Sequence, residues 1–372
     1  MKVGIVVPFS WSYPGAVVEL AENQAAALRA RGHEVKILMG NDPPGYLTRA
    51  LHPRSGRHGT PPGHVIPVGR SVVVPANGSL PNIVLSPRSI WKVREVLREE
   101  QFDVIHLHEP MTPAICVAAL AHAKCPIVAT WHAAGDLGWM RYGLPVWGFL
   151  IDRIDARIAV SPLAASSAGR WLGDEFEIVP NGVVIPEHAD PTDRDHTIVF
   201  IGRHDPRKGL PVLLRAWPEI HRRTGARLRL IGADPLQYRL LHARMGFDET
   251  GIDVLGIVTN EVRTHELARG KLFVSPATGS ESFGLVLAEA FATATPVVAS
   301  NIPGFAAVAA GNVGRLVPPG DEAALTQAIV DVLADEPGRV EMGRAARALA
   351  VERYAWTTIA AQLETIYERV TR

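Results

Sequence analysis

The sequence predicts an α/β protein made of two doubly wound, Rossmann-like domains. Short apolar runs alternate with helical patterns along almost the whole chain. Most of these runs lack a strict apolar–polar alternation, which is typical of strands buried on both faces of a parallel sheet. The length of 372 residues suits two domains, and a polar, proline-bearing stretch at residues 183–196 provides a linker between them.

Each apolar run is expected to form one strand. In the first half the expected strands are residues 3–9, 34–39, 64–68, 102–108, 126–132, 156–161 and 176–182. In the second half they are residues 197–203, 226–232, 252–256, 271–276, 295–300 and 314–317. The linker then divides a first domain, residues 1–183, from a second, residues 184–355. Helices are expected at about 17–31, 322–333, 338–353 and 356–370.

Composition and charge narrow the class of protein. Apolar residues make up 47% and charged residues 20%, which fits a globular protein. The net charge is zero and the pI about 7.3, which argues against a nucleic-acid binder. Cys116 and Cys125 lack metal-site or CxxC spacing, so reduced thiols are expected. No signal peptide and no apolar stretch of membrane-spanning length is found, so a cytoplasmic protein is expected.

The most informative stretch is residues 275–300, SPATGSESFGLVLAEAFATATPVVAS. A strand ends there, a turn of small and polar residues follows, and a helix is expected from about Phe283 to Ala292. The N-terminus of a helix exposes unpaired N–H groups and favours phosphate. Glu281 in the turn and Glu289 in the helix add carboxylates that hold hydroxyl groups. A diphosphate next to the hydroxyl groups of a sugar is the chemistry of a sugar nucleotide. Two such acids also occur by chance on ordinary helices, which is the alternative interpretation.

A second basic turn stands at the start of the second domain, in IGRHDPRKG. Arg203 leaves the strand, and Lys208 precedes Gly209, where a helix begins. Two cations at a strand-to-helix turn suit a diphosphate, and a basic surface loop is the alternative. No cluster of metal ligands is found, so no metal is required, and Mg²⁺ is compatible only as a companion of the diphosphate.

The loop after the first strand, FSWSYPGA, has Gly15 as its one glycine. A dinucleotide-binding oxidoreductase would carry G-x-G-x-x-G at this point, so a nicotinamide-dependent dehydrogenase is disfavoured. His132 follows another expected strand, at the edge of the sheet that lines the ligand crevice of such folds. A structural histidine is the alternative there. Glu109 follows a neighbouring strand, where capping is at least as good an interpretation as catalysis.

Residues 43–94 contain no acid, which is unusual in a neutral chain. This span is either a chance cluster on a loop and a helix or a surface for an anionic lipid or a phosphorylated acceptor. The basic residues proposed for such a surface are Arg49, Arg54, Arg57, Arg70 and Lys92.

Glu281 and Glu289, with seven residues between them, together with the other motifs, resemble the signature of retaining glycosyltransferases of family four. That resemblance covers essentially the whole chain and implies a GT-B fold, two Rossmann-like domains around a deep interdomain cleft, with the final helix, residues 356–372, packed back on the first domain. It also implies roles for individual residues. Glu281 would contact the transferred sugar, Glu289 the nucleotide ribose, and His132 the C6 hydroxyl of the sugar. The donor site would comprise Gly15, Gly202, Arg203, Lys208, Glu281, Ser282, Phe283, Gly284, Leu285 and Glu289.

The same family carries two adjacent glycines in the first loop, whereas this chain has Ala16 in place of the second. A Cβ there hinders close approach of a ligand or a positive φ. The motifs PANGS, FDVIHLHEP, IVATWH, GRHDPRKG and SESFG are most similar to those of members that mannosylate phosphatidylinositol in actinobacteria.

The resemblance implies the transfer of a hexose with retention of the anomeric configuration. The expected reaction moves mannose from GDP-mannose to a lipid headgroup such as phosphatidylinositol. The catalytic residues would be His132, Glu281, Arg203 and Lys208, and the protein would attach peripherally to the inner face of the membrane. Two alternatives stay open. One is a UDP-glucose-type hexosyltransferase acting on another lipid or on a soluble small-molecule acceptor. The other is a binding protein for nucleotide sugars without turnover.

Overall fold

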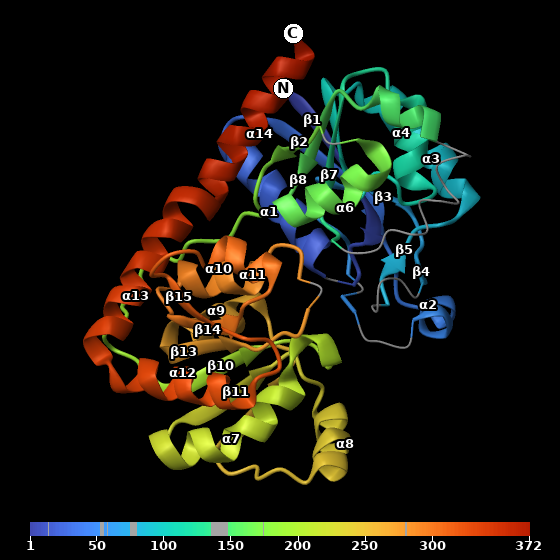
Figure 1. Cartoon of the computed structure of the whole chain (residues 1–372). Helices are drawn as coiled ribbons and strands as arrows, with labels where there is room; N and C mark the ends of the chain where they lie inside the picture. The colour runs from blue at the N-terminus through green and yellow to red at the C-terminus, as the bar shows by residue number, and fades with distance from the viewer. Residues whose placement is uncertain are drawn as a thin grey trace. The chain divides into compact units, whose positions relative to one another are not determined.

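The computed structural model describes residues 1–13, 15–52, 56, 57, 59–74, 80–134, 148–173, 175–279 and 281–372. The chain divides into two compact units (Figure 1). Unit 1 consists of Met1–Gly182 and Trp356–Arg372, and unit 2 of Val183–Ala355. The sequence-based boundary lies one residue later. Each unit is an α/β structure built on a parallel sheet, so the predicted fold class is confirmed.

The sheet of unit 1 has the strand order β3-β2-β1-β6-β7-β8-β9, with every neighbouring pair on this path parallel. Two short strands, β4 and β5, pair antiparallel with each other, and β5 also pairs with β1. The strands are β1 (Lys2–Ser10), β2 (Glu34–Gly40), β3 (Val65–Gly69), β4 (Val72–Val73), β5 (Asn82–Ile83), β6 (Val104–His108), β7 (Ile127–Trp131), β8 (Ala156–Ala159) and β9 (Glu177–Ile178).

Helices cover both faces of this sheet. They are α1 (Ala16–Ala30), α2 (Tyr46–Leu51), α3 (Pro87–Glu100), α4 (Ile115–His122), the 3₁₀ turn η1 (Gly148–Arg153), α6 (Pro162–Leu172) and α14 (Trp356–Thr371). The C-terminal helix α14 lies beside α1 and buries Leu363, Ile366 and Tyr367 in the same core cluster as β1 and β2. A helix far away in the sequence therefore completes the first unit.

Unit 2 has a six-stranded sheet of order β12-β11-β10-β13-β14-β15, with all pairs parallel. The strands are β10 (Asp195–Ile201), β11 (Arg227–Ile231), β12 (Ile252–Gly256), β13 (Gly270–Ser275), β14 (Val297–Ser300) and β15 (Gly314–Val317). The helices are η2 (Pro206–Lys208), α7 (Leu210–Thr224), α8 (Pro235–Met245), α9 (Asn260–Arg269), α10 (Leu285–Ala292), α11 (Pro303–Val308), α12 (Glu322–Ala334), α13 (Glu336–Leu349) and the π turn η3 (Ala350–Tyr354).

Each sheet reverses its direction of strand addition at one point, where a crevice opens beyond the carboxyl ends of the strands. In unit 1 this point lies between β1 and β6, and in unit 2 between β10 and β13. Buried apolar side chains on both faces of the strands, such as Val3, Ile5, Val199 and Phe273, hold these sheets in place. The loops that leave the four strands are therefore the places to look for a site.

The helices expected near the end of the chain form with small differences. The helix expected at 338–353 begins at Glu336, because the Asp335 carboxylate caps it through the Gly338 amide, and it changes to a π turn after Leu349. None of the helices that the structure describes combines the length and the apolar character needed to span a bilayer.

Candidate active site

The basic turn after β10 folds as a tight connection to α7. Asp205 caps the 3₁₀ turn η2 through the Arg207 amide, and its carboxylate also pairs with the Arg207 guanidinium at 2.6 Å. The hydrogen bond from Arg207 lowers the pKa of Asp205, so this acid is ionised and committed to the turn. The remaining cations of the turn are Arg203, which is exposed, and Lys208, whose ammonium pairs with Glu281.

Both the backbone conformation and the surroundings of position 209 require glycine. Its φ is +76°, and a Cβ on it would lie 1.8 Å from the carbonyl oxygen of Pro276. The amide of Thr278 also donates to the Arg207 carbonyl at 2.8 Å. The turn after β10 and the turn after β13 are therefore packed directly against each other, at the switch point of the sheet.

The turn after β13 leads into α10, which begins at Leu285 and not at the expected Phe283. Gly284 adopts φ +84°, outside the helical region, and no side chain caps the helix. A Cβ on Gly304 of α11 would lie 2.1 Å from the Glu281 carbonyl oxygen, so this glycine lets α11 support the turn. The Ser282 hydroxyl is buried without a hydrogen-bond partner among the described residues. The turn thus offers uncapped backbone amides and a free hydroxyl, which suit an anion.

Lys208 and Glu281 are brought together across these two turns. The Lys208 ammonium and the Glu281 carboxylate form an ion pair, with the Glu281 side chain 14% exposed. Arg203 is exposed at the same edge, and Gly202 is packed against Phe200 and Lys208 behind it. The structure therefore gathers Gly202, Arg203, Lys208, Glu281, Ser282, Phe283, Gly284 and Leu285 around the switch point of unit 2.

Glu289 lies one helical turn further along α10 and is held by a residue that the sequence analysis missed. The Arg263 guanidinium of α9 reaches the Glu289 carboxylate at 2.8 Å. Nothing in the sequence connects two residues that are 26 positions apart on separate helices. Arg263 adds a planar cation with several donors to the edge of the site, next to the acid expected to hold the ribose.

In unit 1 the residues that leave β6 and β7 form a compact polar group. The Glu109 carboxylate accepts hydrogen bonds from the amides of His132 and Ala133 at 3.0 and 2.9 Å. Burial raises the pKa of Glu109 to about 7, although the two amide hydrogen bonds act in the opposite direction. Glu109 therefore positions the backbone that carries His132. The interpretation of Glu109 as a first-turn helix cap is wrong, because α4 begins at Ile115 and the Glu109 carboxylate binds amides that follow β7.

Three buried histidines on β6 and directly after β7 are held neutral. Burial lowers the pKa of His132 to about 4 and that of His106 to about 3, and it lowers the pKa of His108 strongly as well. A neutral imidazole has one donor and one acceptor nitrogen. His132 can thus donate or accept one hydrogen bond at a ligand, but it does not supply a positive charge there.

Among the described residues of the first loop, none has a strained backbone that demands glycine. Gly15 has an extended backbone, φ −158°, and precedes α1, whose first residue is Ala16. A Cβ on Gly15 would meet nothing within 4 Å. The substitution of the second glycine by Ala16 therefore needs no positive φ in this chain. Gly15 belongs to unit 1, whereas the other proposed donor residues belong to unit 2.

The basic residues of the acid-free span have different surroundings. Arg49 and Arg70 are exposed, and Lys92 pairs with Glu95 on α3. Arg57 is engaged within the unit, because its guanidinium lies 4.4 Å from the Trp11 ring centroid and 2.8 Å from the Glu22 carboxylate. Arg54 lies outside the described residues. Within the parts of the chain that the structure describes, no group of three potential metal ligands is found.

These two units belong to a known class of enzyme. A family model described as Glycosyltransferase Family 4 matches residues 17–187, and one described as Glycosyl transferases group 1 matches residues 195–335. The chain belongs to glycosyltransferase family four and is a glycosyltransferase, an enzyme that takes a sugar nucleotide and a glycosyl acceptor.

The full-length relatives are more specific. The chain is 36% identical to a phosphatidyl-myo-inositol mannosyltransferase of Mycobacterium leprae, a match that covers 100% of this chain and 97% of the relative. It is 34% identical to the protein of the same name in Mycolicibacterium smegmatis, covering 100% and 94%. A glycogen synthase of Mycobacterium tuberculosis is 26% identical, with 97% and 94% covered.

Solved structures agree on the fold. HepE from Anabaena, determined with UDP and glucose, superposes with a TM-score of 0.73 at 21% identity and covers 99% of both chains. Sucrose-phosphate synthase from Thermosynechococcus elongatus gives a TM-score of 0.73 at 20% identity, with 99% of this chain and 98% of that chain covered. Both are GT-B glycosyltransferases, so the expected GT-B architecture is confirmed.

Proposed function

We propose that this glycosyltransferase moves mannose from GDP-mannose to a hydroxyl of phosphatidylinositol, with retention of the anomeric configuration. The observation that carries the proposal is the 36% identity, over the full length, to an enzyme named phosphatidyl-myo-inositol mannosyltransferase. It acts at the inner face of the cell membrane, to which it binds peripherally.

The diphosphate of the donor binds at the switch point of unit 2. Arg203, Lys208 and the uncapped amides at Gly284 and Leu285 stabilise the negative charge that develops on the leaving diphosphate. Preorganised donors of this kind each lower the barrier by about 3 kcal/mol. The Lys208–Glu281 ion pair supports this assignment, because it holds a cation for phosphate and a carboxylate for sugar hydroxyls side by side.

The two acids have separate roles. Glu281 holds hydroxyls of the transferred mannose, Glu289 holds the ribose of the nucleotide, and His132 contacts the mannose. The acceptor hydroxyl attacks on the face that the diphosphate leaves, and the leaving phosphate oxygen takes the proton of that hydroxyl. The C1–O bond to phosphate breaks and the C1–O bond to the acceptor forms. The atoms and charges of the reaction therefore balance without a covalent enzyme intermediate and without a metal.

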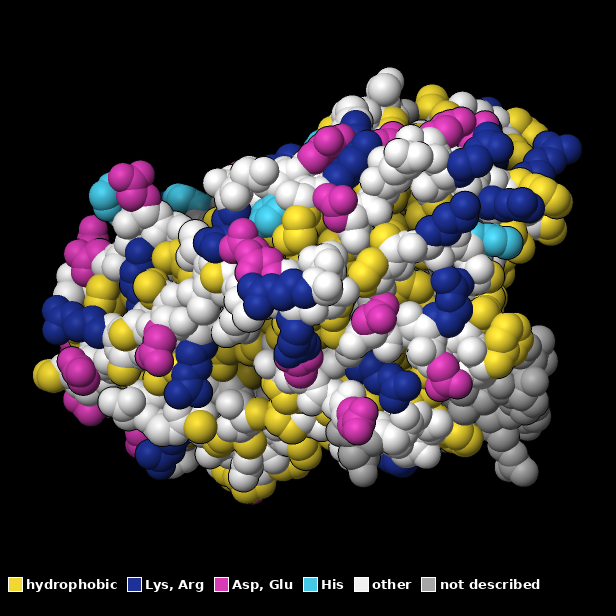
Figure 2. Space-filling model, turned by 90° about the horizontal axis from the view of Figure 1, so that it is seen from above, with side chains coloured by type: hydrophobic (Ala, Val, Ile, Leu, Met, Phe, Trp, Pro, Cys, Tyr) yellow, Lys and Arg dark blue, Asp and Glu magenta, His cyan; other side chains and the backbone are white. Residues whose placement is uncertain are grey.

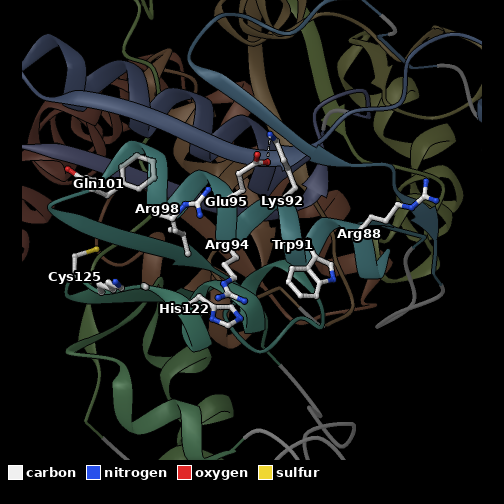
Figure 3. Close-up of a pocket in the computed structure, with 13 residues that line it drawn as sticks. Arg88, Trp91, Lys92, Arg94, Glu95, Arg98, Gln101, His122 and Cys125 are labelled. Carbon is white, nitrogen blue, oxygen red and sulfur yellow. Dashed lines mark hydrogen bonds and ion pairs between the residues drawn. The ribbon is translucent and has the colours of Figure 1, made fainter.

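The membrane-facing surface in this proposal is the groove beside α3. Its volume is about 1010 Å³, and it lies along α3 and the end of α4 (Figure 3). Trp91 is 69% exposed on it. Among the lining residues that the structure describes, Glu95 is the one acid, and the cations are Arg88, Lys92, Arg94, Arg98 and Lys124.

An exposed tryptophan among cations suits the interface of an anionic membrane. In the close-up, Trp91, Arg94 and His122 occupy the same part of the groove, whereas Lys92 turns to Glu95. The face in Figure 2 shows Lys and Arg side chains beside Asp and Glu side chains. Each cation near an anionic surface contributes about 1 kcal/mol, so a few suffice for reversible, salt-sensitive attachment.

The donor and the acceptor are tested by one panel of transfer assays. Purified protein is incubated with GDP-mannose, UDP-glucose or UDP-N-acetylglucosamine, and with vesicles containing phosphatidylinositol, other anionic lipid, or neutral lipid alone. We expect a mannosylated lipid only with GDP-mannose and phosphatidylinositol. Transfer from a UDP-sugar, or transfer to a soluble acceptor in preference to lipid, would replace the proposal with the corresponding alternative.

The docking surface is tested by co-sedimentation with anionic and neutral vesicles at low and high salt. Serine replacements of Arg88, Arg94 and Arg98 should abolish sedimentation with anionic vesicles. The matched control replaces Arg222, Arg353 and Arg372, which are as well exposed and remove the same charge. If the control variant loses binding as strongly as the α3 variant, net charge and not this groove attracts the protein.

A further inference from the structure

The side chain of His132 is held by a second histidine. His108 Nδ1 and His132 Nε2 lie 2.8 Å apart, at the distance of a hydrogen bond, and the two rings are stacked with centroids 5.1 Å apart. His108 is the last residue of β6, and His132 follows β7, the neighbouring strand. One nitrogen of the His132 ring, Nε2, is therefore committed to His108, and the other, Nδ1, makes no hydrogen bond of full geometry to a described residue.

His108 is itself fixed by a third histidine and by the C-terminal helix. The rings of His106 and His108 are parallel within 3°, with centroids 4.8 Å apart. His106 Nε2 lies 2.7 Å from the Thr130 hydroxyl, and its Nδ1 lies 2.5 Å from the Tyr367 hydroxyl of α14 and 3.0 Å from the Gln24 amide of α1. The stack is thus clamped at its far end and cannot turn without breaking these contacts.

Hydrogen-bond counting decides which nitrogen of His132 carries the proton. His108 Nε2 and His132 Nδ1 are both buried without a hydrogen bond of full geometry among the described residues, although the Asn181 amide approaches the His132 ring. If His132 donates to His108, the proton of His108 sits on the partnerless Nε2. A buried N–H without an acceptor is rarer in proteins than a buried acceptor without a donor.

The opposite arrangement moves the buried N–H to Nδ1 of His132, where a bound ligand can accept it. When His108 Nδ1–H donates to His132 Nε2, His108 Nε2 is an acceptor, and the proton of His132 sits on Nδ1. The one unpartnered donor is then the Nδ1–H of His132, which is the atom left for a ligand. Both rings are neutral in either arrangement, so the choice between them rests on hydrogen bonding and not on charge.

We propose that His108 is a positioning residue that fixes His132 as the Nδ1–H tautomer, so that His132 acts as a hydrogen-bond donor to an oxygen of the transferred sugar. This rests on the proposed function for the identity of the ligand. The histidine pair sets the direction of the hydrogen bond at the sugar, and Glu109 sets the position of the backbone. His132 does not act as a base in this arrangement, because its Nε2 lone pair is occupied by His108.

Three substitutions of His108 separate positioning from packing. Asparagine places an amide where Nδ1 stands and can still donate to His132, glutamine places its amide near the Nε2 position, and phenylalanine keeps the ring volume without a donor. Since Nε2 of His108 has no partner, phenylalanine removes one hydrogen bond and leaves the packing intact. His108→Asn should retain kcat within about threefold, whereas His108→Gln and His108→Phe should lower it about tenfold, with a smaller change in the KM for GDP-mannose.

The tautomer itself is measured without activity. Nitrogen-15 NMR of the histidine side chains, with the His132 signals assigned from a His132→Asn variant, reports which ring nitrogen carries the proton. We expect Nδ1 in the wild type and in His108→Asn, and a mixture of tautomers in His108→Phe. Thermal unfolding of each variant checks that it folds.

The outcomes are distinct. A proton on Nε2 of His132 in the wild type, or an unchanged kcat in His108→Phe, would overturn the proposal. If the wild type transfers no mannose from GDP-mannose, the proposed function fails, and the NMR result still decides the tautomer. A proton on Nδ1 together with rescue by asparagine supports the positioning role.

Discussion

The two units have the same strand order around their switch points but build different edges there. In unit 2 the edge consists of charged side chains on two tight turns, with Lys208 paired to Glu281 and Glu289 paired to Arg263. In unit 1 the edge consists of neutral histidines stacked in the interior and of a carboxylate, Glu109, that binds backbone amides. Charge suits the diphosphate of the donor, and a neutral polar edge suits hydroxyl groups.

This difference explains why the two halves respond differently to substitution. A charged edge contributes to chemistry through a few strong electrostatic contacts, so single replacements there should have large effects on transfer. A buried neutral edge contributes mainly through geometry and through stability. Substitutions at the site of unit 2 should therefore reduce transfer strongly, whereas unit 1 should respond mainly in its stability.

The largest effect is expected for Lys208→Ala. Removing this ammonium takes away a charge on the leaving diphosphate and leaves Glu281 without its ion-pair partner. Transfer should fall by about 10²- to 10³-fold in kcat/KM. Arg215→Ala is the matched control, because Arg215 is a cation of the adjacent α7 that pairs with Glu322 on the surface, and it should change transfer little. Comparable losses in both variants would show that the assay reports stability and not the site.

The turn that carries Lys208 should be sensitive to a single methyl group. Gly209→Ala combines a positive φ with a Cβ 1.8 Å from the Pro276 carbonyl oxygen, so we expect a loss of about 2–4 kcal/mol in the free energy of unfolding. Gly246→Ala has a similar φ of +65° but open space around the Cβ, so it should cost about 1–2 kcal/mol. Urea unfolding of both variants makes the comparison. Equal losses would mean that the contact between the two turns contributes nothing.

The two acids of unit 2 should separate in their effects. Glu289→Ala should weaken GDP binding by about 1.5–3 kcal/mol, since it removes a carboxylate acceptor for the ribose and the ion pair with Arg263. Glu281→Gln should lower kcat more than it lowers GDP affinity. Calorimetric titration with GDP and steady-state kinetics measure the two quantities. If both variants lose GDP affinity equally, the division of roles between sugar and ribose is wrong.

Unit 1 should be the acid-sensitive part of the chain. The folded pKa values of His106 and His132 are lowered to about 3 and about 4, below the ordinary 6.5. The unfolded state therefore binds more protons, and the stability contribution is lost as pH falls from 6.5 towards 4, by about 2 kcal/mol per histidine at pH 5. The raised pKa of Glu109 acts in the opposite direction, because protonation of this acid between pH 7 and 4.5 favours the folded state. Glu109 is a single group, however, whereas the histidines with lowered pKa values are several.

Hydrogen exchange at pH 7 and pH 5 tests this acid sensitivity. Amides of β6 and β7 should lose protection at the lower pH more than those of β10 in unit 2, and His108→Phe should reduce the difference. Equal loss of protection in both units would contradict the account of the histidine stack.

The sequence predicts much of this structure because buried parallel strands are visible as apolar runs. Each expected strand forms, and β10 and β13 place Lys208 and Glu281 at the switch point. The start of α10 was misjudged by two residues, since the positive φ of Gly284 is not visible in the apolar pattern. Contacts between segments that are distant in the sequence could not be predicted either. The ion pair between Arg263 and Glu289 does not follow from their spacing in the sequence, and neither does the contact between Tyr367 and His106, because both depend on how helices pack.

The central claim is that the chain transfers mannose, with retention, from GDP-mannose to phosphatidylinositol. Proton NMR of the first product formed from GDP-α-mannose and phosphatidylinositol vesicles tests it most directly, because the anomeric signal reports both the sugar and its configuration. We expect an α-mannosyl linkage to the inositol ring, formed about 10²- to 10³-fold less efficiently by Lys208→Ala. A β-linked product, or a product formed from UDP-glucose and not from GDP-mannose, would contradict it.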